Sequence, residues 1–390
     1  MTIATEPDVI DGDGVRLRAY RAADADDVAA ACADPLTQRF IPTMPHPYTR
    51  DRAMEWIDKG APAAWSAGGA AYAIVDPASD RVIGGIGIER PVPARRQAEI
   101  GYWVAPWARG RGVATAATRA LAEAAFAGIP GGPRVDRLEL LTEWENAASQ
   151  RVALSAGFQR EGVRREAGLL PDGRRYDLVA FTRLATDTGG PVPRLLPDLP
   201  DPATGRARLT DGVVALRPLG PEDVDFFVEL QSLPDVVATN VPPVPADRER
   251  LARRCARATA QWLAGAQADV VVLDAASGDP TGHLSLYYEQ PGLREAMVAY
   301  SVLPPWRGRG YPTRALRLLS RWAFTEAGIA RLYGGTLPDN VGSQRVLEKA
   351  GYRREGVLRG QLPGAGGIRA DDVVYGLLPA DLPEAARPST

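Results

Sequence analysis

Apolar and polar residues alternate in short stretches of the chain, and these stretches predict strands. In 15–18, VRLR, every second residue is apolar, which is the period of a half-buried strand. An alanine-rich segment ending at about Phe126 favours a helix. Asp24 is placed to cap another helix. We expect further strands at 70–76, 81–89, 97–104, 137–142, 158–163 and 176–181, and helices at 24–33, 49–59 and 146–156. Helices that interrupt a mostly antiparallel sheet indicate the α+β class.

The same order of elements occurs twice. Residues 101–126 read GYWVAPWARGRGVATAATRALAEAAF, and residues 299–324 read AYSVLPPWRGRGYPTRALRLLSRWAF. Gly112 and Gly310 are 198 positions apart, whereas Asn146 and Asn340 are 194 apart. A near-constant offset over most of each half indicates an internal duplication. Each copy is expected to be a mixed, mostly antiparallel central sheet flanked by helices.

A proline-rich segment separates the two copies. Residues 185–210 hold prolines at positions 191, 193, 197, 200 and 202. This composition is typical of a semi-rigid linker rather than of a packed element. We therefore expect two folding units, at 10–184 and 211–379. Duplicated domains often keep the contact of an ancestral dimer, so an internal pseudo-dimer is compatible with this organisation.

The loop that precedes the alanine-rich helix is a candidate anion site. It contains Arg109, Gly110, Arg111 and Gly112. The first-turn N–H groups of a helix have no intrahelical partner and, together with the helix dipole, favour a phosphate. Glycines allow that phosphate to approach the backbone closely. A helix start with a solvated pair of arginines is the plainer alternative, and the repetition of the whole pattern argues against it.

Two other phosphate-binding motifs fit this stretch poorly. A dinucleotide-binding Gly-x-Gly-x-x-Gly/Ala motif needs a third small residue where Thr115 stands. A P-loop needs a lysine, and none is present here. The pattern Arg109-x-x-Gly112-x-Ala114 instead resembles the acyl-CoA pyrophosphate loop of the GNAT acetyltransferases. The surrounding Trp-x-Arg-Gly-x-Gly and the later Asn-x-x-Ser resemble the RimJ/RimL-like branch of that family.

This resemblance implies acetyl-CoA or another acyl-CoA as the co-substrate, no metal, and a small-molecule or peptide N-terminal amine as the acceptor. It also implies that a backbone N–H near the end of the strand before the loop stabilises the oxyanion. The donor-binding residues expected from the motif are Val104, Arg109, Gly110, Arg111, Gly112, Ala114, Thr115 and Asn146 in the first copy and Val302, Arg307, Gly308, Arg309, Gly310, Thr313 and Asn340 in the second.

Three side chains are candidates for proton transfer. Glu99 lies on the strand before the loop, where a carboxylate could take the proton of the acceptor amine. An exposed strand residue without a role is the alternative for Glu99. The resemblance places Ser149 and Ser343 near the CoA sulfur and Asn146 and Asn340 near pantetheine. The same Asn-x-x-Ser segments also fit helix caps, and the two roles are compatible.

The two copies differ at positions that matter for this chemistry. Pro312 stands where the first copy has Ala114, so one N–H donor to a phosphate is missing. Met297 stands where the first copy has Glu99, and Glu295, two residues upstream, is the nearest carboxylate on that strand. We therefore expect the first copy to carry most of the turnover.

The composition of the chain limits the compartment and the partners that we expect for it. The 390 residues carry a net charge of −2 with a pI of about 5.9, so no general attraction to nucleic acid or anionic lipid is expected. Cys32 and Cys255 imply no disulfide framework, which favours a reducing cytoplasm. We expect no membrane span and no signal peptide before Asp8. His46 and His283 are too far apart to suggest a metal site and are expected as an exposed loop residue and a packed strand residue.

Two further function classes stay open at this point. One is a non-catalytic CoA-binding or scaffold protein with a degenerate second copy. The other is a transferase of the same fold that uses an aminoacyl-tRNA as the donor, against which the mild negative charge argues. Titration of acetyl-CoA into the protein separates a CoA-dependent enzyme from a scaffold that has lost its ligand.

Overall fold

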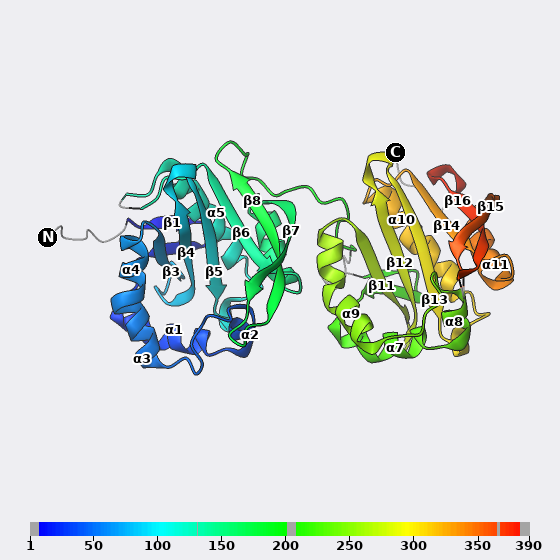
Figure 1. Ribbon diagram of the computed structural model, residues 1–390, viewed down its shortest axis with the longest axis horizontal. Helices are drawn as coiled ribbons and strands as arrows, with labels where there is room; N and C mark the ends of the chain where they lie inside the picture. The colour runs from blue at the N-terminus through cyan, green and yellow to red at the C-terminus, as the bar shows by residue number, and fades with distance from the viewer. Residues whose placement is uncertain (1–7, 131, 201–207, 365–366, 383–390) are drawn as a thin grey trace. The chain divides into compact units, whose positions relative to one another are not determined.

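The structure, a computed structural model, describes residues 8–130, 132–200, 208–364 and 367–382. The chain divides into two compact units, Met1–Pro193 and Arg194–Thr390, called unit 1 and unit 2 below. Each unit is built on one eight-stranded sheet with helices packed against it (Figure 1). The predicted α+β class, with one mixed sheet in each copy, is confirmed.

The elements of the two units follow one another in the same order. Those of unit 1 are β1 (Ile10–Gly12), β2 (Val15–Arg18), α1 (Ala25–Cys32), α2 (Pro35–Phe40), α3 (Arg50–Glu55), α4 (Ala61–Ser66), β3 (Ala70–Val75), β4 (Val82–Val92), β5 (Gln97–Val104), α5 (Val113–Ala127), β6 (Arg137–Glu143), α6 (Ala147–Ser155), β7 (Gln159–Leu169) and β8 (Arg175–Leu184). Those of unit 2 are β9 (Leu209–Thr210), β10 (Val214–Pro218), α7 (Val224–Gln231), α8 (Pro234–Thr239), α9 (Arg248–Leu263), β11 (Gln267–Asp274), β12 (Pro280–Gln290), β13 (Glu295–Val302), α10 (Tyr311–Thr325), β14 (Arg331–Thr336), α11 (Val341–Ala350), β15 (Arg353–Pro363) and β16 (Arg369–Leu377).

In each sheet the two parallel strands pair over three residues and then separate; the space between them is called the opening below. The strand order is β1-β2-β3-β4-β5-β6-β8-β7 in unit 1 and β9-β10-β11-β12-β13-β14-β16-β15 in unit 2. Within the described part of unit 1, β5 and β6 are the one parallel pair, and their pairing is limited to 97–99 with 137–139. In unit 2, β13 and β14 pair only at 295–297 with 331–333. Beyond these residues the facing edges of the strands keep backbone groups that a ligand can use.

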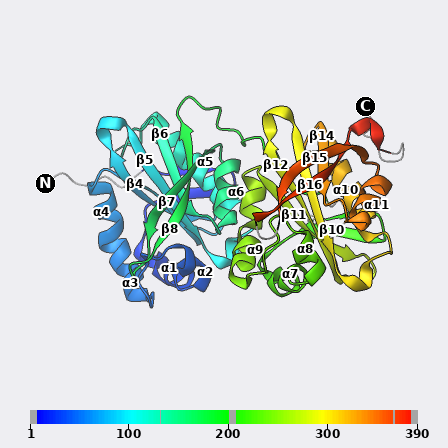
Figure 2. The same ribbon diagram turned by 45° about the vertical axis from the view of Figure 1, so that its right-hand side comes forward.

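The helix after each loop is held by a stripe of small and branched side chains. In α5, Ala117, Leu121 and Ala125 recur every fourth residue and are fully buried. The matching residues of α10, Ala315, Leu319 and Ala323, are buried as completely. In unit 2, α10 also lies beside α11 (Figure 2). This packing fixes the first turn of each helix, and therefore its free N–H groups, above the sheet.

Asp24 does not cap α1 with its side chain, contrary to our expectation. Its buried carboxylate accepts hydrogen bonds from the Arg18 guanidinium at 2.8 and 2.9 Å and from the Arg21 N–H at 2.8 Å. Arg18 is itself buried, and a buried guanidinium needs an opposite charge. This ion pair occupies the oxygen atoms that a cap would use.

The segment expected to be an unpacked linker is partly packed. Leu196 and Leu199 are buried in the core of unit 2, and Trp262 Nε1 donates to the carbonyl of Pro197 at 2.9 Å. In unit 1, Val192 N–H donates to the Leu154 carbonyl at 2.9 Å. Proline content alone does not reveal such burial, because the two leucines fill a hydrophobic surface far away in the sequence. Residues 201–207 of this segment, with its last proline, lie outside the described residues.

Candidate functional site

The loop before α5 presents unpartnered backbone donors. Gly110 and Gly112 have φ angles of 74° and 77°, in the left-handed region that glycine adopts without strain. A Cβ at either position would meet no atom within 4 Å. Among the described residues no side chain caps α5, and its first backbone bond runs from Ala116 N–H to the Gly112 carbonyl. The N–H groups of the first turn, including those of Ala114 and Thr115, therefore face open space suited to a phosphate.

The arginine side chains of this loop do different things. Arg109 Nη2 lies 2.5 Å from Asp34 Oδ2 and 2.8 Å from Thr37 Oγ1, so its guanidinium ties the loop to α2. Burial raises the pKa of Asp34, but the bonds from Arg109 and Thr37 outweigh it and hold the pKa below its usual value. Arg111 is exposed, 3.8 Å from Asp76, and is the arginine with a charge available to a phosphate. The Arg109 side chain therefore holds the loop against α2, and its backbone is the part that remains available to a phosphate.

The corresponding loop of unit 2 has fewer backbone donors. Gly308 and Gly310 keep φ angles of 72° and 81°. Pro312 is the second residue of α10 and has no N–H. The Tyr311 hydroxyl donates to the Asp274 carboxylate. Arg307 pairs with Asp235 of α8 at 2.7 Å. In the first turn of α10, Tyr311 and Thr313 keep N–H groups that make no bond within the helix, because the first such bond runs from Arg314 N–H to the Gly310 carbonyl.

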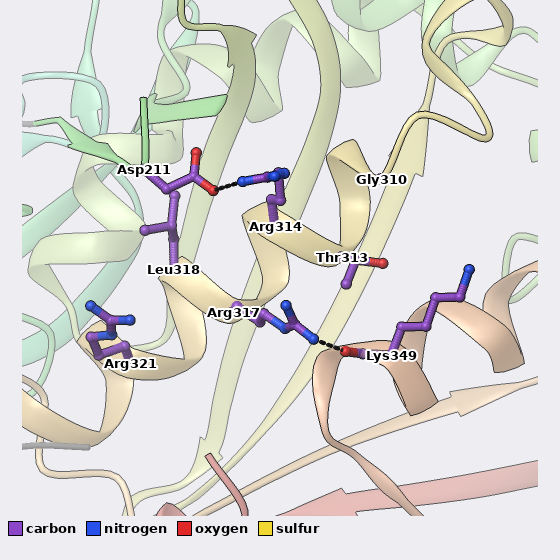
Figure 3. Close-up of a pocket in the computed structure, with 8 residues that line it drawn as sticks. All are labelled: Asp211, Gly310, Thr313, Arg314, Arg317, Leu318, Arg321 and Lys349. Atoms are coloured by element: carbon purple, nitrogen blue, oxygen red, sulfur yellow. Dashed lines mark hydrogen bonds and ion pairs between the residues drawn. The ribbon is translucent and has the colours of Figure 1, made fainter. Parts of the chain in front are cut away.

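A basic pocket extends from this loop along α10. The cavity has a volume of about 610 Å³. Figure 3 shows the side chains that line it, most of them from α10. Its lining residues are Asp211, Gly310, Thr313, Arg314, Arg317, Leu318, Arg321 and Lys349. Arg314 pairs with Asp211 at 2.8 Å, and Arg317 donates to the carbonyl of Lys349. The four basic residues of this pocket are Arg314, Arg317, Arg321 and Lys349. The matching residues of unit 1 are Ala116, Arg119, Glu123 and Ser155, so this strongly basic surface is a feature of unit 2.

The end of β5 offers a backbone N–H to a developing oxyanion. Ala105 N–H donates to the Ile83 carbonyl of β4 at 2.9 Å. Because N–H groups alternate between the two edges of a strand, the Val104 N–H points to the edge that faces β6. The backbone N–H expected near the end of this strand is therefore that of Val104. In unit 2, Leu303 N–H bonds the Thr281 carbonyl in the same way, but Arg307 Nε also donates to the Val302 carbonyl at 3.0 Å.

A tyrosine and a serine meet beside the opening in both units. The Tyr102 hydroxyl lies 2.9 Å from Ser149 Oγ, and the Tyr300 hydroxyl lies 2.8 Å from Ser343 Oγ. Burial raises the pKa of both phenols, so they stay protonated. The tyrosines were not among our expected site residues. Their repetition at matching positions was the signal in the sequence that could have found them.

The asparagines before these serines act as helix caps. Asn146 Oδ1 accepts the Ser149 N–H at 3.1 Å, and Asn340 Oδ1 accepts the Ser343 N–H at 3.1 Å. Each cap fixes the first turn of its helix and so places the serine hydroxyl toward the tyrosine. The Oδ1 atoms of Asn146 and Asn340 are thus already engaged as acceptors.

Glu99 lies on the opposite face of β5 from Tyr102. Side chains alternate along a strand, so Glu99 shares its face with Gly101 and Trp103. Trp103 packs with residues of α1 and α3, and Tyr102 reaches α6. The Glu99 carboxylate pairs with Arg90. The Glu99 side chain and the Tyr102–Ser149 pair therefore lie on opposite faces of β5.

A row of carboxylates crosses this face of unit 1. Glu89 of β4 is opposite Glu99 of β5, which is opposite Glu139 of β6. Glu139 is buried and lies 2.8 Å from Arg137 and 2.6 Å from Arg164. Its burial raises the pKa, but the two arginines outweigh that effect and lower it. The row depends on the register of three strands, which the sequence does not reveal.

The same row in unit 2 contains no carboxylate. Tyr287 is opposite Met297, which is opposite Tyr333. Glu295 belongs to the same face but pairs with Arg331 at 3.1 Å. Arg254 of α9 reaches over this face, with its Nη2 3.0 Å from the Tyr287 hydroxyl and 2.8 Å from Asp269 Oδ1. Unit 2 thus places a neutralised ion pair where unit 1 places acids.

His283 belongs to that ion-paired cluster. Its Nε2 lies 3.1 Å from Asp269 Oδ1, which also accepts the Ser285 hydroxyl at 2.7 Å. His283 is buried, and this burial lowers its pKa. His46 is exposed, with Nδ1 2.7 Å from Gln38 Oε1. Both histidines lie where we expected them.

The described residues limit other chemistries. Cys32 and Cys255 are both free thiols in the interior. Within the described ranges, no three histidine, cysteine or acidic side chains are arranged to hold a metal ion. None of the helices in these ranges has the length and apolar character needed to cross a bilayer.

Comparison with known proteins identifies a domain twice in the chain. The family model described as "Acetyltransferase (GNAT) domain" matches residues 15–159 and 214–353. The chain is 37% identical over 101 residues to "Probable N-acetyltransferase YjcK" of Bacillus subtilis. This match covers 26% of this chain and 55% of that protein. It is 28% identical over 97 residues to "Uncharacterized N-acetyltransferase YnaD" of the same organism, covering 25% and 56%. The matches thus span about half the length of these relatives.

Solved structures of similar fold include that of Mycobacterium smegmatis RimJ in complex with CoA-disulfide. The similarity has a TM-score of 0.41 at 24% identity and covers 45% of this chain and 86% of that one.

Proposed function

Since the chain belongs to the acetyltransferase (GNAT) family, whose domain it carries twice, we propose that it moves an acetyl group from acetyl-CoA to a primary amine and that unit 1 performs the turnover. The observation that carries the proposal is the set of free first-turn N–H groups of α5 beside the unpaired edge of β5. Together they offer one binding track for pyrophosphate and for the extended chain that follows it. The acceptor is a small-molecule amine or a peptide N-terminus.

Unit 1 supplies each step of this transfer with its own groups. The amides of 112–115 and the Arg111 charge hold the pyrophosphate. The Val104 N–H stabilises the oxyanion as the amine attacks the thioester carbonyl. The Ser149 hydroxyl, hydrogen-bonded to Tyr102, donates toward the departing sulfur. The acidic face carrying Glu99 receives the amine and takes up its proton.

Unit 2 is proposed to bind CoA with little or no turnover. Pro312 removes one donor to the pyrophosphate, and Arg307 occupies the Val302 carbonyl at the edge of β13. The basic pocket along α10 offsets the missing donor by offering guanidinium groups to phosphates. Met297 leaves no carboxylate in the matching row. Unit 2 is therefore a second, regulatory or storage site for the donor.

Calorimetric titration and a thiol-release assay test this proposal together. Acetyl-CoA titrated into the whole chain is expected to bind at two sites of different affinity. Free CoA thiol is expected to appear when acetyl-CoA is mixed with one class of amine in a panel of a polyamine, an aminoglycoside and peptides with free N-terminal alanine or serine. Absence of both heat and thiol release would contradict the proposal, whereas binding without thiol release from any amine would leave a CoA-binding scaffold.

A further inference from the structure

We propose that Glu89, and not Glu99, is the carboxylate that takes the proton from the acceptor amine in unit 1. The proposal rests on the acetyltransferase function proposed above and names a further catalytic residue for it. Glu89 is on β4, outside the strand and the motifs that the sequence singles out.

The position of Glu89 favours it over Glu99. A Cβ built on Gly101 would lie 3.4 Å from Glu89 Oε1, so the carboxylate extends over Gly101. Gly101 is two residues nearer than Glu99 to the Val104 N–H, a distance of roughly 7 Å along a strand. Gly101 also follows the last residue of β5 that pairs with β6. The Glu89 carboxylate thus faces the part of β5 where the opening begins, whereas Glu99 lies at its closed end.

The ion pairs of the acidic row, which is formed by Glu89, Glu99 and Glu139, also favour Glu89 as the base. Glu99 is bound by Arg90, and Glu139 is bound by Arg137 and Arg164. Among the described residues, no basic side chain pairs with Glu89. A general base must have a free carboxylate within hydrogen-bond reach of the amine, directly or through one water. Glu89 is the member of the row that meets this condition without breaking an ion pair.

The surroundings of Glu89 also suit a base. Glu89 is exposed at the surface of the sheet, but protein atoms crowd its carboxyl group, and this partial burial raises its pKa. The charge of Arg90 opposes the rise and the charge of Glu99 adds to it. Glu99 therefore acts through Glu89 as a positioning residue, because it holds Arg90 and contributes a neighbouring negative charge. In unit 2 the matching residue is Tyr287, whose hydroxyl bonds Arg254.

In the proposed step, one proton of the acceptor goes to Glu89 and one goes to the departing sulfur. The acceptor ammonium gives one proton to the Glu89 carboxylate, which becomes a carboxylic acid. The neutral amine attacks the thioester carbonyl, a C–N bond forms and the C–S bond breaks. The sulfur takes up the second proton lost by the nitrogen, relayed by the Ser149 hydroxyl. The products are an N-acetyl amide and a free thiol, and Glu89 releases its proton to water.

The pH dependence of kcat/KM in matched variants tests this assignment. Glu89→Gln is expected to lower kcat/KM by about 100-fold or more and to remove the acidic limb of the profile. Glu89→Asp keeps a carboxylate one methylene further away, so an intermediate loss with the limb retained is expected. Glu99→Gln is expected to keep most of the rate and to move the acidic limb to lower pH, because it removes the charge that raises the Glu89 pKa and frees Arg90. Glu55→Gln, an exposed carboxylate on α3, is the control.

The outcomes separate this role from the function beneath it. A folded Glu89→Gln protein with wild-type kcat/KM would overturn the role of Glu89 while leaving the acetyltransferase intact. Loss of the acidic limb in Glu99→Gln, with the limb kept in Glu89→Gln, would assign the base to Glu99. A wild-type protein that releases no thiol with any amine of the panel would overturn the acetyltransferase proposal and the role of Glu89 with it. Circular dichroism melting of each variant establishes that it is folded.

Discussion

Units 1 and 2 share a sheet, a glycine loop and a capped Asn-x-x-Ser helix, yet they differ on the two surfaces that a bisubstrate enzyme needs. On the donor side, unit 1 offers a complete first turn of amides, whereas unit 2 has Pro312 and a basic pocket. On the acceptor side, unit 1 has three glutamates in register, whereas unit 2 has Tyr287, Met297 and Tyr333.

Features that the two units share belong to the fold, whereas features that only one unit has are candidates for the chemistry. The buried stripe of α5 and α10, the left-handed glycines and the Tyr–Ser contact are the same in both units. Packing and backbone geometry require them whether or not the unit turns over. The acidic row and the free amides are not needed for packing. The acidic row is present in unit 1 alone and the first turn of amides is complete only there, so both features are informative about catalysis.

The largest effect is expected from a carboxylate placed in the glycine loop of each unit. Gly112→Glu places a negative charge in the phosphate path, and like charges about 4 Å apart near a protein surface repel by roughly 4 kcal/mol. Donor binding at unit 1 should weaken on the order of 1,000-fold, and thiol release should fall with it. Gly310→Glu carries the same left-handed backbone strain, so it is the matched control, and it should remove binding at unit 2 while thiol release persists. Equal loss of turnover in both variants would contradict the assignment of turnover to unit 1.

The next effect concerns the departing sulfur. Ser149→Ala is expected to lower kcat by about 100-fold, since general acid catalysis typically contributes that much or more, whereas Ser343→Ala should leave kcat unchanged. Each serine hydroxyl also bonds a tyrosine, at 2.9 and 2.8 Å, so the two variants lose the same structural contact. Steady-state thiol-release kinetics measure both. If Ser343→Ala abolished the rate and Ser149→Ala did not, the catalytic unit would be unit 2.

A smaller effect is expected from exchanging the second helical residue. Ala114→Pro removes one N–H that faces the pyrophosphate in unit 1, and Pro312→Ala restores it in unit 2. A charge-assisted hydrogen bond is worth about 1.5–3 kcal/mol, so affinity for acetyl-CoA should fall about tenfold or more at unit 1 and rise by a similar factor at unit 2. Calorimetric titration of the whole chain resolves the two sites. An unchanged affinity in Pro312→Ala would mean that the basic pocket, rather than the amides, holds the donor there.

Much of this architecture could be predicted from the sequence because its signals are local. Period-two strands, the Arg-Gly-Arg-Gly loop and the Asn-x-x-Ser caps each depend on residues close together in the chain. Helix 49–59 was underestimated, because α3 continues through a π-helical turn at Trp56–Gly60 into α4. The hairpin of β7 and β8 also extends further than expected, to Leu169 and Arg175.

The acceptor side could not be predicted in the same way. Glu89 and Glu99 are ten positions apart, and their meeting depends on the register of the β4–β5 hairpin. The pairing of Arg109 with Asp34 joins residues 75 positions apart. Such contacts are set by how the strands and loops come together. The sequence alone therefore indicates Glu99 as a base and does not reveal that Arg90 binds its carboxylate. Register, more than motif, decides which acid is available.

The smallest expected effect is a pH-dependent stability of unit 2. His283 is buried beside Asp269, Arg254 and Asp223, and its burial lowers its pKa below the ordinary value near 6.5. Arg254 already balances the charge of Asp269, so a second cation there is unfavourable. As the pH falls below about 6.5, the unfolded chain binds a proton that the folded chain refuses. The free energy of unfolding should therefore fall by up to about 1.4 kcal/mol from pH 7.5 to pH 5.5, because pH 5.5 lies about one unit below the ordinary pKa.

Calorimetric melting of the whole chain at the two pH values measures this effect. The transition of unit 2 should move to lower temperature at pH 5.5, by about 2–4 °C for each kcal/mol. His283→Gln keeps an N–H for Asp269 but does not titrate, so the shift should shrink in this variant. His46→Gln is the matched control, since His46 is the other histidine of the chain and is exposed in unit 1. Unit 1 has Gly85 in the register of His283 and should melt without this dependence. A shift that survived in His283→Gln would place its origin in other groups and remove this contrast between the two units.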